Sequence, residues 1–165
     1  MTQPLVGILM GSDSDLPVME KAAEVLGEMG VACEMDISSA HRLPDRTAEY
    51  AKTARQRGIE VLICGAGMAA HLAGVVASHT TLPVIGVPLK SGALNGVDAL
   101  YSTVMMPPGI PVATVAVDGA KNAAYLACSI LSIKRPELAE NLELFRERTR
   151  QALLGKSREL KARNG

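Results

Sequence analysis

Short apolar runs alternate along the chain with longer segments whose apolar residues recur at helical spacing. The runs at 4–10, 59–64, 82–88 and 110–117 are almost continuously apolar, which is typical of strands buried on both faces of a parallel sheet. Polar residues interrupt the run at 31–37, so we expect this strand to lie nearer an edge. The pattern therefore predicts a parallel sheet of five strands.

The helical segments lie between and after these strands, at 16–29, 44–57, 69–79, 96–105 and 119–134. The first of them has one apolar stripe, formed by Met19, Ala22, Ala23, Leu26 and Met29. Since strands and helices alternate regularly and no linker or internal repeat interrupts them, residues 1–165 are predicted to form one α/β domain. We expect a doubly wound, three-layer sandwich of the flavodoxin or Rossmann kind.

The last segment, 136–165, is expected to form an additional helix that Pro136 opens. Its apolar stripe comprises Leu138, Leu142, Phe145, Thr149 and Leu153. The five-stranded unit is already complete without it, so this stripe is predicted to pack on a neighbouring subunit of a homo-oligomer. From residue 146 onward the chain contains seven Lys or Arg but only two Glu. Such a charge run favours a solvated helix face over a contact with nucleic acid.

Composition and charge narrow the choice of partners. Hydrophobic residues make up 48% of the chain and aromatic residues only 2%, so small aliphatic side chains must fill the core. A formal net charge of zero argues against nucleic acid or an anionic membrane as partner. Cysteines 33, 64 and 128 suit neither a disulfide framework nor a metal cluster. We expect reduced, buried thiols in a cytoplasmic protein whose first apolar run is too short for export.

Four loops that follow predicted strands are rich in polar residues and glycine. They are "GSDSD" (11–15), "SSAHR" (38–42), "GAGMAAHL" (65–72) and "LKSGALNG" (89–96). The loops that follow helices are minimal. Because ligands of an open parallel sheet bind outside the carboxyl ends of the strands, this asymmetry predicts a ligand site at that edge.

The first two loops contain groups suited to an anion such as phosphate. Ser12 and Ser14, with amides at the following helix start, offer donors, and Arg42 can bind phosphate oxygens as a fork. Asp13 and Asp15 would repel phosphate, so at least one should face sugar hydroxyls or solvent. Two structural alternatives stay open: that Asp15 merely caps a helix, and that Arg42 forms a surface salt bridge.

His41 is the candidate for proton transfer, because imidazole titrates near neutral pH without heavy tuning. His71, at the start of the third predicted helix, is either a supporting residue or a structural one. The glycines of "GAGMAAHLAG" allow backbone to approach a ligand closely, and free amides at a helix start could hold a carboxylate.

Other functions fit less well. "GAGMAA" matches the dinucleotide fingerprint, but it follows the third strand and no acidic ribose-binding residue follows the fourth. A serine hydrolase would require G-x-S-x-G, which does not occur, and metal catalysis lacks ligands at plausible spacing. A non-enzymatic nucleotide-binding module would leave His41 without a role.

Six motifs resemble those of the N5-carboxyaminoimidazole ribonucleotide mutase family in order and spacing. They are "MGSDSD", "SAHRLPDR", "GAGMAAHLAG", "LPVIGVPL", "ALNGVDALYS" and "MPPGIPVATVAV". The loops resemble the bacterial mutase class. The resemblance implies a cofactor-free shift of a carboxyl group from the exocyclic nitrogen to ring carbon four of an aminoimidazole ribonucleotide, in a homo-octamer. A direct carboxylase that uses carbon dioxide and the aminoimidazole itself is the alternative.

The resemblance also implies roles for individual residues. Ser12, Asp15 and Arg42 match nucleotide-binding positions; Ser39, Gly67 and Leu72 match positions around the base and carboxylate; His41 matches the general acid and base. Ser14 and His71 are expected to support these residues, and no metal ligand is implied. The chain departs from the family pattern at Met68, Ala73 and Met105, which affects pocket geometry and not reaction class.

Overall fold

The computed structural model describes residues 3–163, and its elements follow the predicted alternation closely. In chain order they are β1 (Val6–Met10), a short 3-10 helix η1 (Asp13–Asp15), α1 (Leu16–Glu28), β2 (Cys33–Ile37), α2 (Pro44–Ala54), β3 (Val61–Gly67), α3 (Leu72–Ser78), β4 (Val84–Leu89), α4 (Val97–Val104), β5 (Ala113–Thr114), α5 (Ala120–Leu131) and α6 (Pro136–Arg163).

All five strands run parallel, in the order β2-β1-β3-β4-β5. This confirms the predicted doubly wound sheet. Every residue of β1 and β4 is buried, as continuous apolar runs require. The strand expected near an edge, β2, is an edge strand. The chain reverses its direction across the sheet between β1 and β3, so the loops after these two strands lie at the switch point where such folds bind ligands.

The fifth strand is shorter than predicted. Only Ala113 and Thr114 pair with β4 within the described chain, opposite Ile85 and Gly86, and both are at least partly exposed. The expectation of a fully buried strand over 110–117 is therefore wrong. β5 is the second edge of the sheet, and Pro111, just before it, has no N–H to donate to a ladder.

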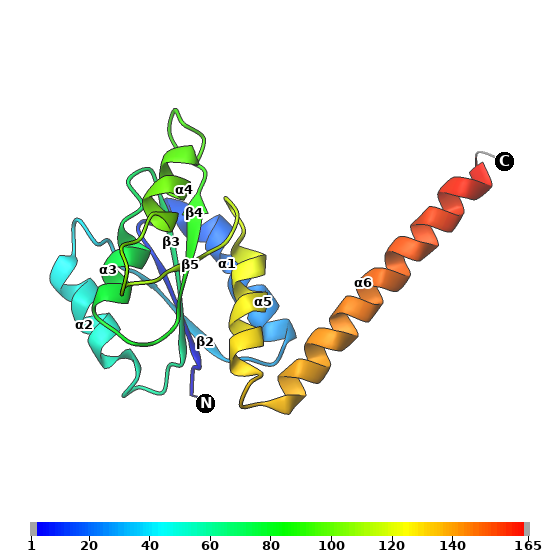
Figure 1. The fold of residues 1–165 in the computed structure, drawn as a ribbon, viewed down its shortest axis with the longest axis horizontal. Coiled ribbons are helices and arrows are strands. Elements are labelled where there is room, and N and C mark those ends of the chain that lie inside the picture. Colours follow the sequence, from blue (N-terminus) through cyan, green and yellow to red (C-terminus); the bar gives the residue numbers. More distant parts are fainter. Residues whose placement is uncertain (1–2, 164–165) are drawn as a thin grey trace.

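Helices cover both faces of the sheet (Figure 1). α1 and α5 bury one face in a cluster that includes Met19, Val25 and Leu26, while α2 and α3 cover the other. α4 lies on the α3 side, because Gly86 of β4 faces both Ala73 and Thr103. The buried stripe of α1 contains Val25, whereas the predicted Ala23 is only partly buried. Four alanines on α5 allow close helix-on-sheet contact, as the low aromatic content predicted: Ala120, Ala123, Ala124 and Ala127.

The long helix α6 starts against the domain and then projects away from it (Figure 1). Leu138 and Leu142 are buried, and the Phe145 ring stacks on Tyr125 with centroids 4.5 Å apart. The expectation that this stripe has no place on its own chain is thus wrong for its first two turns. Beyond them the leucines are exposed: Leu144, Leu153, Leu154 and Leu160. No helix within residues 3–163 is both long and apolar enough to cross a membrane.

The three cysteines are free thiols. Cys64 and Cys128 are buried as expected, and burial raises the pKa of Cys64 strongly and that of Cys128 to about 11. Cys33 on the edge strand is only half-buried, contrary to expectation. Raised pKa values keep the buried thiols protonated and unreactive.

Candidate active site

A cavity of about 350 Å³ opens at the carboxyl edge of the sheet, between the loops that follow β1, β2, β3 and β4. All nine residues predicted for the site lie on its walls: Ser12, Ser14, Asp15, Ser39, His41, Arg42, Gly67, His71 and Leu72. The four loops thus converge on one space, as the edge rule for parallel sheets requires.

A capping box shapes the loop after β1. The Ser12 amide donates to Asp15 Oδ2 at 3.0 Å, and the Ser12 hydroxyl donates to Asp13 Oδ1 at 2.8 Å. The Ser14 amide donates to Asp13 Oδ1 at 3.0 Å. The two carboxylates therefore occupy the Ser12 and Ser14 amides. At the helix start, the Leu16 amide already donates to the Asp13 carbonyl and Pro17 has no N–H, so the expectation of free amides for an anion is wrong there too.

The two aspartates of this loop differ in surroundings. Asp13 is exposed, and hydrogen bonds from Ser12 and Ser14 lower its pKa. Asp15 is partly buried at the cavity, and burial raises its pKa despite the bonds it accepts. Asp13 accordingly faces solvent, and Asp15 is the carboxylate that faces the cavity. Asp15 does cap, but it bonds back to Ser12 at the start of η1 and makes no cap bond to α1.

The loop after β2 holds Arg42 from two sides. Its Nη2 donates to the Gly11 carbonyl at 2.9 Å, and its Nε donates to Ser39 Oγ at 3.3 Å. The Arg42 amide also donates to Ser39 Oγ, at 3.2 Å. The predicted alternative of a surface salt bridge does not occur among the ion pairs of the described chain. Arg42 instead ties the loop after β2 to the loop after β1.

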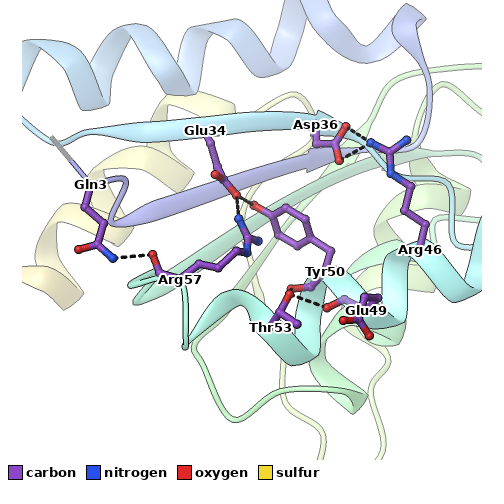
Figure 2. A network of polar contacts seen from close by, with 8 residues as sticks. All are labelled: Gln3, Glu34, Asp36, Arg46, Glu49, Tyr50, Thr53 and Arg57. Carbon is purple, nitrogen blue, oxygen red and sulfur yellow. Dashed lines mark hydrogen bonds and ion pairs between the residues drawn. The ribbon is translucent and has the colours of Figure 1, made fainter. Parts of the chain in front are cut away.

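Polar contacts between α2 and the edge strand fix the far end of this loop (Figure 2). Asp36 at the end of β2 accepts two bonds from Arg46 Nη2, both 2.8 Å long. Further along, Glu34 accepts from the Tyr50 hydroxyl at 2.6 Å and from Arg57, whose guanidinium lies 4.4 Å from the Tyr50 ring centre. These contacts hold both ends of the segment that contains His41 and Arg42.

His41 and His71 meet across the cavity wall. His41 Nε2 lies 2.7 Å from His71 Nδ1, and the rings are nearly perpendicular. One nitrogen must donate and the other accept, so this contact holds a proton. Both side chains are exposed enough for a ligand to reach them. His71, left open by the sequence, therefore touches the proton-transfer candidate directly.

The loop after β3 is held mainly through its backbone. The Ala70 amide donates to Ser102 Oγ of α4 at 3.0 Å and lies 2.9 Å from the Met68 carbonyl. Gly67 packs closely against Ser91, so that a Cβ there would require the Ser91 side chain to move. The amides of Ala70 and His71 already have carbonyl acceptors, so the predicted free amides begin no earlier than Leu72.

Sequence reasoning missed three residues of this site. Met68 and Ser91 lie on the cavity wall, and Ser102 holds the loop after β3 from behind. Ser91 and Ser102 belong to "LKSGALNG" and "ALNGVDALYS", segments already singled out as a rich loop and as a motif. Met68 was expected to alter the geometry of the pocket, as a departure from the family pattern, but no role in the site was assigned to it.

A larger hollow of about 820 Å³ lies at the opposite edge and includes Lys52, Arg55 and His79. It is formed by the carboxyl-terminal ends of α2 and α3, whose carbonyls carry partial negative charge. Arg55 already donates to Thr81 Oγ1 at 3.0 Å. No group suited to proton transfer converges there as His41 and His71 do, so the smaller cavity is the better candidate. Nor do three His, Cys, Asp or Glu side chains within residues 3–163 gather as a metal site would require.

Comparisons with known proteins agree with this architecture. Residues 5–152 match the AIR carboxylase family. A Thermotoga maritima protein named N5-carboxyaminoimidazole ribonucleotide mutase is 60% identical over 157 residues, which cover 95% of this chain and 92% of that protein. A Pyrococcus abyssi protein of the same name is 66% identical, over 87% of this chain and 83% of its own. The crystal structure of Treponema denticola PurE superimposes with a TM-score of 0.88 at 33% identity, covering 96% and 99% of the two chains.

Proposed function

The chain belongs to the AIR carboxylase family, and we infer that it catalyses the reaction for which its mutase relatives are named. It converts N5-carboxyaminoimidazole ribonucleotide to 4-carboxy-5-aminoimidazole ribonucleotide in purine biosynthesis. The reaction is an isomerisation, because the carboxyl group moves from the exocyclic nitrogen to ring carbon four of the same molecule. The observation that carries this proposal is the meeting of His41, His71 and Arg42 with a glycine-rich loop in one cavity.

The phosphate of the substrate binds at the Arg42 end of the cavity. A guanidinium has five N–H donors, and two of those on Arg42 are used by Gly11 and Ser39. The remaining donors suit phosphate oxygens, and the Ser12 hydroxyl joins them by exchanging its bond to Asp13 for one to the phosphate. Asp15 accepts from the ribose hydroxyls. An ionised carboxylate is a good acceptor from a hydroxyl, and Asp15 lies on the cavity wall close enough for the Arg42 charge to act on it.

The imidazole and its carboxyl group lie between Ser39, Gly67 and Leu72. In this arrangement the reacting atoms lie near the His41 and His71 pair, which lines the same cavity. Gly67 presents bare backbone, and Leu72 presents an apolar wall at the start of α3. Ser14 lies beside Ser12 and supports the loop after β1.

His41 acts first as acid and then as base. It gives a proton to the carbamate nitrogen, the nitrogen–carbon bond breaks, and carbon dioxide and the aminoimidazole are formed. Ring carbon four then attacks the carbon dioxide, and neutral His41 removes the proton from that carbon. The proton returns to its starting place, so none is consumed. His71 positions the His41 ring through the 2.7 Å contact.

No cofactor enters this scheme, and the carbon dioxide is not covalently held between the two half-reactions. Trapping it therefore matters as much as moving the proton. A molecule that escapes from the cavity ends the productive turnover. The walls contributed by the loop after β3 therefore have to keep water out while the carboxyl group is detached.

A homo-octamer would give the exposed apolar surfaces partners. The leucines along α6 and a face of α4 formed by Val97, Tyr101, Val104 and Met105 are exposed in one chain. We place the protein in the cytoplasm, without nucleic acid or membrane as partner. Light scattering after size exclusion should give eight times the mass of the chain, and a monomer would contradict the assembly.

One assay tests the activity directly. Purified protein is given N5-carboxyaminoimidazole ribonucleotide without ATP, metal or added bicarbonate, and the carbon-carboxylated product is followed against a protein-free control. We expect conversion well above the spontaneous rate. Turnover only from aminoimidazole ribonucleotide and bicarbonate would make the protein a direct carboxylase. If neither assay gives product, the protein would be a nucleotide-binding module without this activity.

A further inference from the structure

Met68 adopts a backbone conformation that its side chain disfavours. Its φ is 54°, in the left-handed region, which it shares with Asn95 and Asp118 as the non-glycine residues of residues 3–163 found there. Asn and Asp tolerate this region because their short polar side chains can bond locally, whereas a long side chain gains nothing comparable. Met68 is therefore the outlier, and it lies on the wall of the cavity.

The rest of the loop enforces this conformation. The Met68 carbonyl accepts from the Ala70 amide at 2.9 Å, and that amide also donates to Ser102 Oγ at 3.0 Å, whose own proton is donated to the Asp98 carbonyl at 2.7 Å. Gly67, the preceding residue, packs closely against Ser91. The backbone on both sides of Met68 is thus held, so the strain persists in the folded protein. Glycine at this position would adopt the same φ freely.

The Met68 side chain reaches across to the loop after β4. Its Cγ and Cε lie 3.7 and 4.0 Å from the position that a Cβ on Gly92 would occupy. The contact is an ordinary van der Waals one between an apolar side chain and bare backbone. Met68 is 60% exposed and lies at the rim of the cavity, between the loops after β3 and β4, on the side where the carboxyl group is proposed to bind.

We propose that Met68 is the residue that retains carbon dioxide in the cavity between the two half-reactions; this inference rests on the proposed function. A residue kept in a strained conformation at a site is a pointer to function. The thioether is flexible enough to close over a small ligand. It has no acidic proton and is a poor nucleophile toward carbon dioxide, unlike water, which would convert the molecule to bicarbonate and a proton.

The test uses substrate labelled with carbon-13 in the transferred carboxyl group, in buffer with unlabelled bicarbonate. The fraction of label kept in the product is measured for the wild type and for Met68→Gly, Met68→Ala and Met68→Leu. Ile133→Ala is the control, since Ile133 is an apolar side chain 83% exposed that lies outside the cavity wall. A protein-free sample corrects for spontaneous loss.

We expect the wild type, Met68→Leu and Ile133→Ala to keep the label alike. Met68→Gly and Met68→Ala should lose it several-fold more and release more aminoimidazole ribonucleotide per turnover. Met68→Gly should also melt no lower than Met68→Ala, because glycine relieves the strain. A merely structural role would move stability and leave label retention unchanged.

Two results overturn the inference. If Met68→Gly and Met68→Ala both turn over with full label retention, Met68 does not close the cavity, although the proposed function stands. If the wild type does not isomerise the substrate at all, the proposed function fails and this inference fails with it.

Discussion

The loops after β2 and β3 both reach the reacting end of the cavity, but the protein holds them in different ways. Side chains fix the first: Arg42 bonds to Ser39 and Gly11, and Asp36 pairs with Arg46 at its base. The second is held through its backbone, by the bond from the Ala70 amide to the Ser102 hydroxyl, and it contains a strained residue, Met68. If the nucleotide binds as proposed, its phosphate meets a loop already fixed by side-chain bonds, and its carboxyl group meets a loop that acts by shape and by exclusion of water.

Removing His41 breaks the contact between the two loops and should have the largest effect on activity. His41→Asn is expected to lower kcat by about 10²–10⁴-fold, the usual contribution of a general acid or base. Binding of the product nucleotide should change little, because phosphate and ribose contacts are intact. Steady-state rates and calorimetric titration measure the two. Lost binding in a variant that folds normally would mean that His41 holds the substrate instead.

Weakening the fixed loop should affect binding more than chemistry. In Arg42→Lys the fork to Ser39 and Gly11 is lost and a single point charge is left. We expect KM to rise about 10–100-fold, equivalent to losing one or two bonds to a charged group, with kcat nearly unchanged. Arg55→Lys, at the opposite hollow, serves as the control. Equal effects of the two variants would remove Arg42 from the phosphate site.

Loosening the loop after β3 should have a smaller effect. Ser102→Ala removes the hydroxyl that accepts from the Ala70 amide, and we expect kcat/KM to fall about 3–10-fold, in line with one neutral hydrogen bond. Ser129→Ala in α5 is matched, since Ser129 also bonds within its own helix, to the Tyr125 carbonyl at 3.0 Å. A comparable loss in Ser129→Ala would show that the effect is a general one on folding.

The smallest effect on activity is expected at the network behind the fixed loop. Tyr50→Phe keeps the ring beneath Arg57 but removes the bond to Glu34, and should lower the free energy of unfolding by about 1–2 kcal/mol at pH 7. Activity at 25 °C should stay within about twofold of the wild type, because a loss of this size leaves nearly all molecules folded.

The same variant has a defined pH dependence. Burial raises the pKa of Glu34, but the bonds from Tyr50 and Arg57 outweigh burial and bring it below the ordinary value of 4.5. The folded-state pKa is thus depressed, so the stabilisation is complete above pH 4.5 and is lost as pH falls through the lowered value. Denaturant unfolding at pH 7 and pH 3.5 should show the wild type and Tyr50→Phe converging. A gap that widens at low pH would contradict the assigned sign.

The fold was predictable because its signals are local and repeated. Continuous apolar runs identified the central strands, and interruption of 31–37 identified β2 as an edge. The convergence of the nine candidate residues followed from the rule that ligands bind at the carboxyl ends of parallel strands. Their individual roles remain predictions.

The details that sequence reasoning missed depend on which donor pairs with which acceptor and on which segments pack together. The amides after β1 looked free, but Asp13 and Asp15 accept from them. β5 looked buried, although its residues pair over a short stretch at an edge. The loop around Met68 is held by contacts of its neighbours, Gly67 and Ala70, with Ser91 and Ser102, which lie more than twenty residues away in the chain. Such pairings become visible only when distant segments are placed together.

The most direct test of this division of the cavity is a crystal structure of the His41→Asn variant with 4-carboxy-5-aminoimidazole ribonucleotide bound. We predict the phosphate on Arg42 and Ser12, the ribose on Asp15, and the carboxylate beside Gly67 and Leu72. A nucleotide bound in the reverse orientation, or seated in the hollow near Arg55, would contradict the account.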